Sequence, residues 1–225
     1  MRDFVFPIAL CTRLENELDV SAVLGSAFLI GNRGFAITAK HVIKNHPIEN
    51  LMAMFVDEQG QWIGRGFKAI EEHSIEDIAV LQLPDAGWSS PFRFSREVVH
   101  SGLDYHLMGY PEDTTFELIA EGKALLRPDL VYNRGYVRRR FTGSLPMLHG
   151  LSFIELSEVA GSGASGAPVF AIRNRAYNVV GVYCGKKTND RSTSVSYATR
   201  VESINDWVPE LIQTSIFNES QNSVR

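Results

Sequence analysis

Three separate segments of the chain carry side chains that together could perform nucleophilic catalysis. His41 follows a short apolar run, Asp77 precedes another, and Ser165 lies in a glycine-rich segment. A serine hydroxyl is a weak nucleophile at neutral pH, so acyl transfer needs a histidine base beside it and a carboxylate that orients the imidazole. The sequence therefore predicts catalytic roles for His41, Asp77 and Ser165.

The glycines beside Ser165 suit the formation of an oxyanion hole. Gly163 and Gly166 allow sharp backbone turns, so that two N–H groups can point at one developing negative charge. We assign this role to the N–H groups of Gly163 and Ser165. The nucleophile elbow G-x-S-x-G fits less well, because Ala167 occupies its last position and no strand followed by a long helix surrounds it.

Short β-rich runs bounded by Gly, Pro, Asn or Asp make up most of the chain, which predicts an all-β barrel or sandwich. Helical spacing is convincing only over residues 201–215, where one apolar stripe predicts an amphipathic helix. The stripe consists of Val201, Ile204, Trp207, Val208, Leu211 and Ile212. We expect a flexible tail at 216–225 and a mobile surface loop over 112–144, which includes three consecutive arginines at 138–140.

The segments resemble the trypsin-like (chymotrypsin-fold) serine proteases, and among them the small bacterial members akin to the Deg/HtrA protease domain. The order His, Asp, Ser matches this family and differs from the order in α/β-hydrolases. The resemblance extends over about residues 20–210. It rests on segments similar to the family's histidine, aspartate and serine motifs, a Gly-Tyr-Pro stretch and the closing strand: Gly25–Ile30, Ala36–Val42, Asp77–Leu81, Met108–Pro111, Gly163–Pro168 and Tyr197–Trp207.

This resemblance implies two six-stranded antiparallel β-barrels with the catalytic residues between them and a C-terminal α-helix. We expect one peptidase domain over residues 1–215, with the N-terminal barrel at about 1–95, the C-terminal barrel at about 100–200 and the closing helix at about 201–215. We expect no PDZ domain in this chain.

Two departures from the family bear on activation and specificity. Ala164 replaces the aspartate that precedes the serine in digestive members, so activation by a new N-terminus is not expected. By resemblance the pocket for the P1 side chain, which precedes the cleaved bond, is lined by residues without acidic groups: Val159, Ala160, Val182, Tyr183 and Cys184. The resemblance therefore implies a preference for a small or apolar P1 residue.

Composition excludes several other classes of protein. Lys plus Arg is 22 and Asp plus Glu is 26, which gives a net charge of −4 and argues against a nucleic-acid partner. The two cysteines, Cys11 and Cys184, form no metal-binding or disulfide pattern, and the apolar runs are too short to span a membrane. We therefore expect a cytoplasmic protein that needs no metal or other cofactor.

The sequence thus favours an intracellular serine endopeptidase that acts on protein or peptide substrates. Two alternatives remain open. One is a protease fold used as a binding or scaffold module with little or no proteolytic activity, because fold does not fix function. The other is a latent protease that a regulatory protein partner activates by ordering the loops around 112–146 and 183–194.

Overall fold

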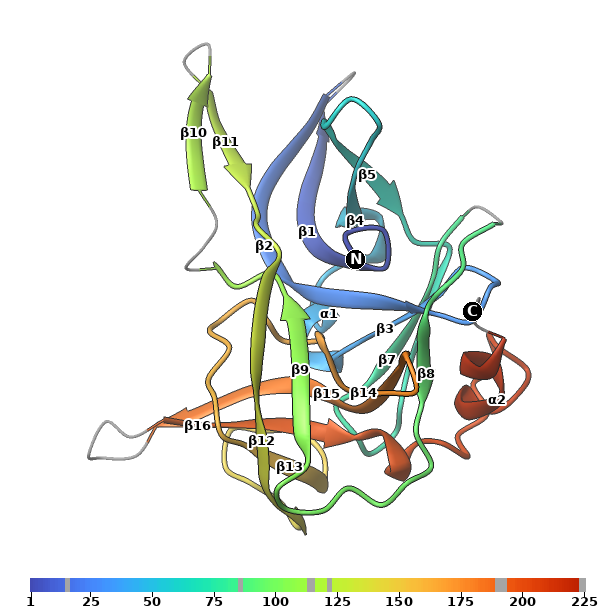
Figure 1. Ribbon diagram of the computed structural model, residues 1–225. Coiled ribbons are helices and arrows are strands. Elements are labelled where there is room, and N and C mark those ends of the chain that lie inside the picture. Colours follow the sequence, from blue (N-terminus) through green and yellow to red (C-terminus); the bar gives the residue numbers. More distant parts are fainter. Residues whose placement is uncertain (15–16, 85–86, 113–115, 121–122, 189–193, 223–225) are drawn as a thin grey trace.

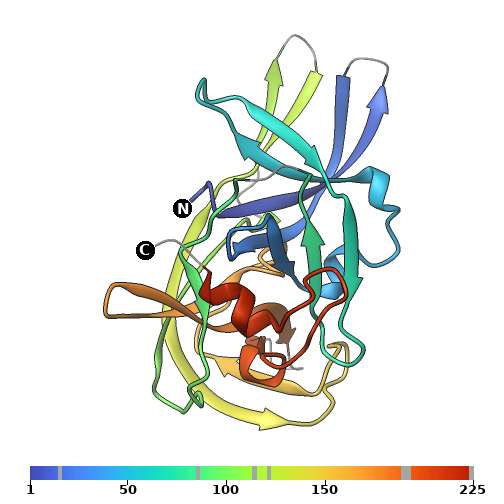
Figure 2. The same ribbon diagram turned by 90° about the vertical axis from the view of Figure 1, so that its right-hand side faces the viewer.

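Two β-sheets, one from each half of the chain, lie against each other in this computed structural model (Figure 1). The structure describes residues 1–14, 17–84, 87–112, 116–120, 123–188 and 194–222. A short hairpin of β10 (Phe116–Ala120) and β11 (Lys123–Arg127) forms a third, two-stranded sheet. It projects from the same end of the molecule as the β1–β2 hairpin (Figures 1 and 2).

The N-terminal sheet contains seven antiparallel strands among the described residues, in the order β5-β4-β1-β2-β3-β7-β6. These are β1 (Val5–Leu14), β2 (Glu17–Ile30), β3 (Phe35–Thr38), β4 (Leu51–Val56), β5 (Trp62–Gly66), β6 (Ala69–Glu72) and β7 (Ala79–Gln82). A four-residue helix, α1 (Lys40–Ile43), follows β3 directly, and a 3-10 turn at Ile48–Asn50 leads into β4.

The C-terminal sheet closes on itself, because β14 pairs with both β9 and β15. The closed sheet consists of β9 (Asp104–Gly109), β12 (Val131–Thr142), β13 (Ser152–Leu156), β14 (Pro168–Arg173), β15 (Ala176–Thr188) and β16 (Ser194–Arg200). A seventh strand, β8 (Phe92–Phe94), joins β15 in parallel from outside this closed set. The predicted double-barrel, all-β architecture is confirmed: six strands form the closed C-terminal set, with β8 as an added seventh, and the N-terminal sheet has seven strands among the described residues.

Strand alternation explains why several central strands are apolar on both faces. In β3, Ala36 faces the interior of the N-terminal barrel whereas Phe35 and Ile37 face a second core between the barrels. Phe28 on β2 and Phe92 on β8 meet edge to face in this second core, with ring centroids 5.5 Å apart. Successive side chains point to opposite faces of a strand, so a strand covered on both sides loses its polar positions.

The residues of the apolar stripe over 201–215 form turns instead of the predicted helix. The structure has a 3-10 turn at Val201–Ser203, further turns, and then α2 at Ile216–Gln221, within the expected tail. Pro209 disfavours helical geometry at Val208 and cannot donate a backbone hydrogen bond, whereas the Ser215 hydroxyl caps α2 by accepting from Asn218 N.

No helix in the described part of the chain is long and apolar enough to cross a membrane.

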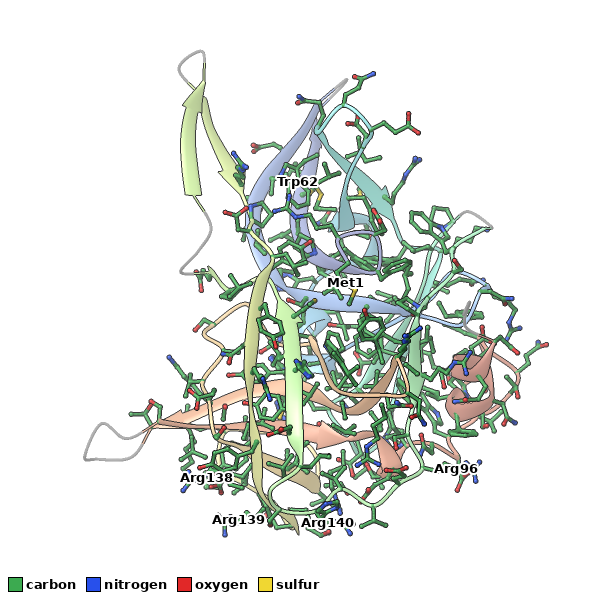
Figure 3. All side chains as sticks on the ribbon, in the orientation of Figure 1. Met1, Trp62, Arg96, Arg138, Arg139 and Arg140 are labelled. Carbon is green, nitrogen blue, oxygen red and sulfur yellow. The ribbon has the colours of Figure 1, made fainter. Side chains whose placement is uncertain are left out.

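Residues 112–144, which were expected to form an irregular mobile loop, instead contain β-strands. Much of 112–144 forms β10, β11 and the long strand β12, and β15 extends through 188. The three arginines at 138–140 lie along the outer edge of the C-terminal barrel (Figure 3). Arg138 and Arg139 pair with Glu155 on β13, and Arg140 pairs with Glu202. Cross-strand pairing of opposite charges favours this extended structure.

Candidate active site

The ends of two paired strands bring His41 and Asp77 together. Thr38 at the end of β3 lies opposite Ala79 at the start of β7, so the residues just after β3 face the residues just before β7. His41 lies in α1, which begins two residues after Thr38, and Asp77 lies in the turn that joins β6 to β7. The strand register therefore determines this pairing, although 36 residues separate the two in sequence.

Asp77 makes two hydrogen bonds with His41. Its Oδ1 accepts from the His41 backbone N at 2.9 Å, and its Oδ2 lies 2.6 Å from His41 Nδ1. Asp77 is 1% exposed whereas the imidazole is one-third exposed. An ionised carboxylate only accepts hydrogen bonds, so a neutral His41 carries its proton on Nδ1. Its Nε2 then has the lone pair that a general base needs.

Ser165 is held in a loop that contacts both barrels. Its carbonyl accepts from Ser26 N of β2 at 2.7 Å, and the next residue, Gly166, donates its N–H to Tyr183 O of β15 at 2.7 Å. Gly163 and Gly166 have φ values of +83° and +89°, in the left-handed region that glycine adopts without a steric penalty. These glycines thus allow the turn that the sequence predicted around Ser165.

Gly25 shows how closely the serine loop approaches the histidine segment. A Cβ atom at Gly25 would lie 2.7 Å from the Cγ atoms of Val42 and 2.8 Å from Ser165 O. Val42 directly follows His41, so the backbone of Ser165 and the histidine segment contact the same glycine. A Cβ at Gly166 would likewise lie 3.1 Å from Ala39 N. The structure thus places the three predicted catalytic residues around the junction of the two barrels.

The peptide between Ser162 and Gly163 is fixed in one orientation. Ser162 O accepts from Glu112 N at 2.6 Å. The next peptide is held as well, because Gly163 O accepts from Ser26 Oγ at 3.1 Å. The N–H and C=O of a trans peptide point in opposite directions, so Gly163 N–H points away from Glu112. Within the described residues, the N–H groups of Gly163 and Ser165 donate to no backbone carbonyl. They are the two groups predicted for the oxyanion hole.

The predicted pocket residues lie in three different environments. Tyr183 and Ala160 pack with Ala164 inside the C-terminal barrel, whereas Val182 packs in the core between the barrels and Cys184 packs with aromatic residues of β13 and β16. Tyr183 is fully buried, and burial raises its pKa to about 12. Val159 is partly exposed. The structure therefore brings Ala160 and Tyr183 together but directs the side chain of Val182 elsewhere.

Two further residues support the site and were not singled out in the sequence. Ser26 Oγ accepts from Tyr110 N at 2.9 Å while it donates to Gly163 O, so it links β2 to the serine loop. Glu76 is 4% exposed, and its carboxylate accepts from backbone N–H groups of the C-terminal barrel. A polar residue within an apolar run, such as Ser26 between Gly25 and Ala27, was the available signal. Nothing in the sequence indicated the partners of Glu76.

Cys184 lies near the His41–Asp77 pair as a protonated thiol. Burial raises its pKa well above the ordinary value, and the negative charge of Asp77 raises it further. Its Sγ donates to Tyr197 O at 3.3 Å. A buried thiol of this kind is a weak nucleophile. Cys184 is therefore a packing residue beside the site rather than a competitor of Ser165.

Comparisons with known proteins agree with this fold. The trypsin-like peptidase domain family matches residues 25–182, and a search of curated proteins found no match. Similar solved structures include an inactive form of Rv3671c from M. tuberculosis H37Rv, with 16% identity and a TM-score of 0.58 over 88% of this chain and 82% of that one.

Two further solved structures share the fold. The MamO protease domain from Magnetospirillum magneticum matches with 14% identity and a TM-score of 0.59 over 90% of this chain and 94% of that one. The HtrA-type protease AlgW, solved with a decapeptide, matches with 13% identity and a TM-score of 0.63 over 90% of this chain, which spans 62% of the AlgW chain. Because the family match spans well over half of the residues, the chain belongs to the trypsin-like peptidase domain family.

Proposed function

We propose that the protein is a serine endopeptidase that cleaves protein or peptide substrates through an acyl-enzyme. Ser165 Oγ attacks the carbonyl carbon of the cleaved bond while His41 Nε2 takes the hydroxyl proton. His41 returns that proton to the leaving amine, and water then hydrolyses the ester in the same way. Asp77 orients His41, and the N–H groups of Gly163 and Ser165 stabilise the oxyanion.

The pairing of His41 with Asp77 carries this proposal. Both Asp77 oxygens bind His41, one through the backbone N and one through Nδ1 at 2.6 Å. A carboxylate buried to this extent is costly unless its hydrogen bonds are satisfied, and here its partners fix the imidazole tautomer that general-base catalysis requires. The fixed Ser162–Gly163 peptide adds a prearranged donor for the oxyanion.

The environment of Ala160 and Tyr183 supports a preference for small or apolar P1 residues. Both are buried in the same apolar cluster of the C-terminal barrel as Ala164, the residue before Ser165. None of the predicted pocket residues is charged. A library of peptide substrates tests this preference, and strong cleavage after Lys or Arg contradicts it. One methylene in such a pocket changes selectivity by about 1–3 kcal/mol.

The two free cysteines support a function in a reducing compartment, the cytoplasm. Cys11 and Cys184 are both buried and lie in separate clusters, so each packs as a small apolar side chain. Disulfides persist mainly in oxidising compartments, and the described fold is held by packing without one. The proposed cytoplasmic location is tested by fractionation of cells that express the tagged chain.

Intact-mass analysis after treatment with a fluorophosphonate probe tests the proposed function. We expect rapid addition of one probe to the wild-type protein and none to Ser165→Ala, because only a serine activated by its base and facing an oxyanion hole reacts quickly. A wild-type protein that stays unlabelled would contradict a competent active site. It would instead favour the binding-module function or a latent enzyme that needs a regulatory partner.

A further inference from the structure

The residue before the catalytic aspartate connects the two barrels. Glu76 is 4% exposed, and its Oε2 accepts from Leu151 N at 3.0 Å and from Ser152 N at 3.3 Å. Glu76 belongs to the N-terminal barrel, whereas Ser152 begins β13 of the C-terminal barrel. Hydrogen bonds to an ionised acceptor are stronger than neutral ones, so this buried carboxylate is a firm link between the barrels.

Gly150 shows that the two segments lie in direct contact. A Cβ atom at Gly150 would lie 2.6 Å from Glu76 Oε2 and 3.3 Å from Asp77 N. Gly150 also has φ of +100°, a conformation that L-residues rarely adopt. The segment before β13 therefore packs on the backbone of Glu76 and Asp77 themselves, and only glycine permits this approach.

The backbone of Glu76 is fixed at the same time. Its N–H donates to His73 Nδ1 at 2.9 Å, and its carbonyl accepts from Ile78 N at 2.8 Å. Arg200 of β16 supplies a nearby positive charge. Burial and the charge of Arg140 lower the pKa of this guanidinium, and the charges of Glu202 and Glu76 oppose that shift. The side chain of Glu76 thus joins a rigid turn of one barrel to the strand ends of the other.

We propose that Glu76 is a positioning residue for the serine-protease reaction. His41 and Asp77 come from the N-terminal barrel and Ser165 from the C-terminal barrel, so catalysis depends on how the two barrels are positioned relative to each other. By holding the 73–77 turn on the start of β13, Glu76 sets the position of the Asp77–His41 pair relative to Ser165. This inference rests on the proposed function.

The test measures two constants of fluorophosphonate labelling, the maximal rate constant of labelling (kinact) and the probe concentration at half that rate (KI). It also measures the melting temperature. Glu76→Ala leaves two N–H groups without their acceptor and releases the turn, so we expect kinact to fall about 10- to 100-fold with KI within about threefold of wild type. Glu76→Gln keeps an oxygen acceptor, and we expect its kinact to stay within about fivefold of wild type.

Glu71→Ala is the matched control. Glu71 of β6 also accepts from two backbone N–H groups, those of Glu210 and Leu211, but it lies outside the Asp77 turn. We expect this variant to lower the melting temperature without changing kinact. If Glu76→Ala does not fold, Gly150→Ala replaces it, because its Cβ would displace the same carboxylate and should lower kinact in the same way.

The outcomes separate this inference from the proposed function. Labelling of wild type but not of Ser165→Ala, together with a loss in Glu76→Ala and its recovery in Glu76→Gln, supports both. If wild type is labelled and Glu76→Ala or Gly150→Ala retains the wild-type kinact, the positioning role is wrong and the protease function stands. If wild type is not labelled, the proposed function fails and the positioning role fails with it.

Discussion

At the scale of single residues, Asp77 determines which nitrogen of His41 can accept a proton. Its carboxylate accepts from Nδ1 and from the backbone N of the same histidine, so rotation of the ring and of the backbone are both restricted. Replacing an oxygen of this carboxylate by an amide N–H₂ introduces a donor opposite Nδ1. The imidazole then takes the other tautomer, with its proton on the nitrogen that should act as the base.

We predict that Asp77→Asn lowers kcat by about 10⁴-fold while the protein remains folded. The physical reason is the wrong tautomer of His41, because the size and shape of the side chain are conserved. Kinetics on the best peptide from the library, together with circular dichroism, checks this. Asp57→Asn is the control, since Asp57 accepts from Gln59 N and Gln61 N in an exposed turn. Equal loss of kcat in both variants would contradict the assigned role.

At the scale of secondary-structure elements, the turn between β6 and β7 is organised by His73. Its Nδ1 accepts from Ile75 N and Glu76 N at 3.1 and 2.9 Å, and its ring contacts Trp207 edge to face. Lys40 Nζ donates to His73 O at 2.9 Å. Only an unprotonated Nδ1 can accept these hydrogen bonds, so the turn that carries Asp77 needs a neutral His73.

This requirement predicts a loss of stability in mild acid. Burial lowers the pKa of His73 below its ordinary value of 6.5, the Glu76 charge opposes this and the Lys40 charge adds to it. The unfolded chain therefore binds the proton at higher pH than the folded chain. Stability from His73 is complete above about pH 6.5 and is lost as the pH falls through the lowered folded-state pKa.

Urea unfolding of His73→Asn at several pH values checks this prediction. Asparagine can accept a backbone N–H two residues ahead but does not titrate, so we expect a weaker pH dependence of the unfolding free energy between about pH 7.5 and 5. His100→Asn, at an exposed histidine, should keep the wild-type dependence. Identical pH dependences in wild type and His73→Asn would show that His73 does not control the turn.

Elements differ in how far the sequence could predict them. His41, Asp77 and Ser165 could be proposed from the sequence because each motif is local, and the pairing of β3 with β7 then brings the first two together. The prediction of a helix over 201–215 was wrong, because apolar residues three apart also suit turns that pack on a core. Cys184 lies where the β15–β16 register shifts, and such a bulge changes which face a side chain occupies. Local sequence could not reveal that shift.

At the scale of the whole molecule, the chain after β16 returns to the N-terminal barrel and packs on it. Glu219 of α2 is fully buried, and its Oε2 accepts from Arg33 Nε at 2.9 Å and Arg33 Nη2 at 2.5 Å. Arg33 lies in the turn after β2 and also donates to Ile212 O at 2.9 Å. These contacts join segments 186 residues apart in sequence, so they stabilise the fold only when both ends of the chain are in place.

We predict that Arg33→Ala destabilises the protein by about 3 kcal/mol, because it leaves the Glu219 carboxylate buried without its partner. Adding Glu219→Gln removes that buried charge, so the double variant should recover most of the loss even though it has fewer ion pairs. Urea unfolding measures both. Arg134→Ala is the control, because Arg134 pairs with Asp104 on the surface at 3.4 Å with both side chains exposed, and should cost less than about 1 kcal/mol. A double variant as unstable as Arg33→Ala alone would mean that Arg33 contributes by packing on Phe35, over which its guanidinium lies, rather than by neutralising Glu219.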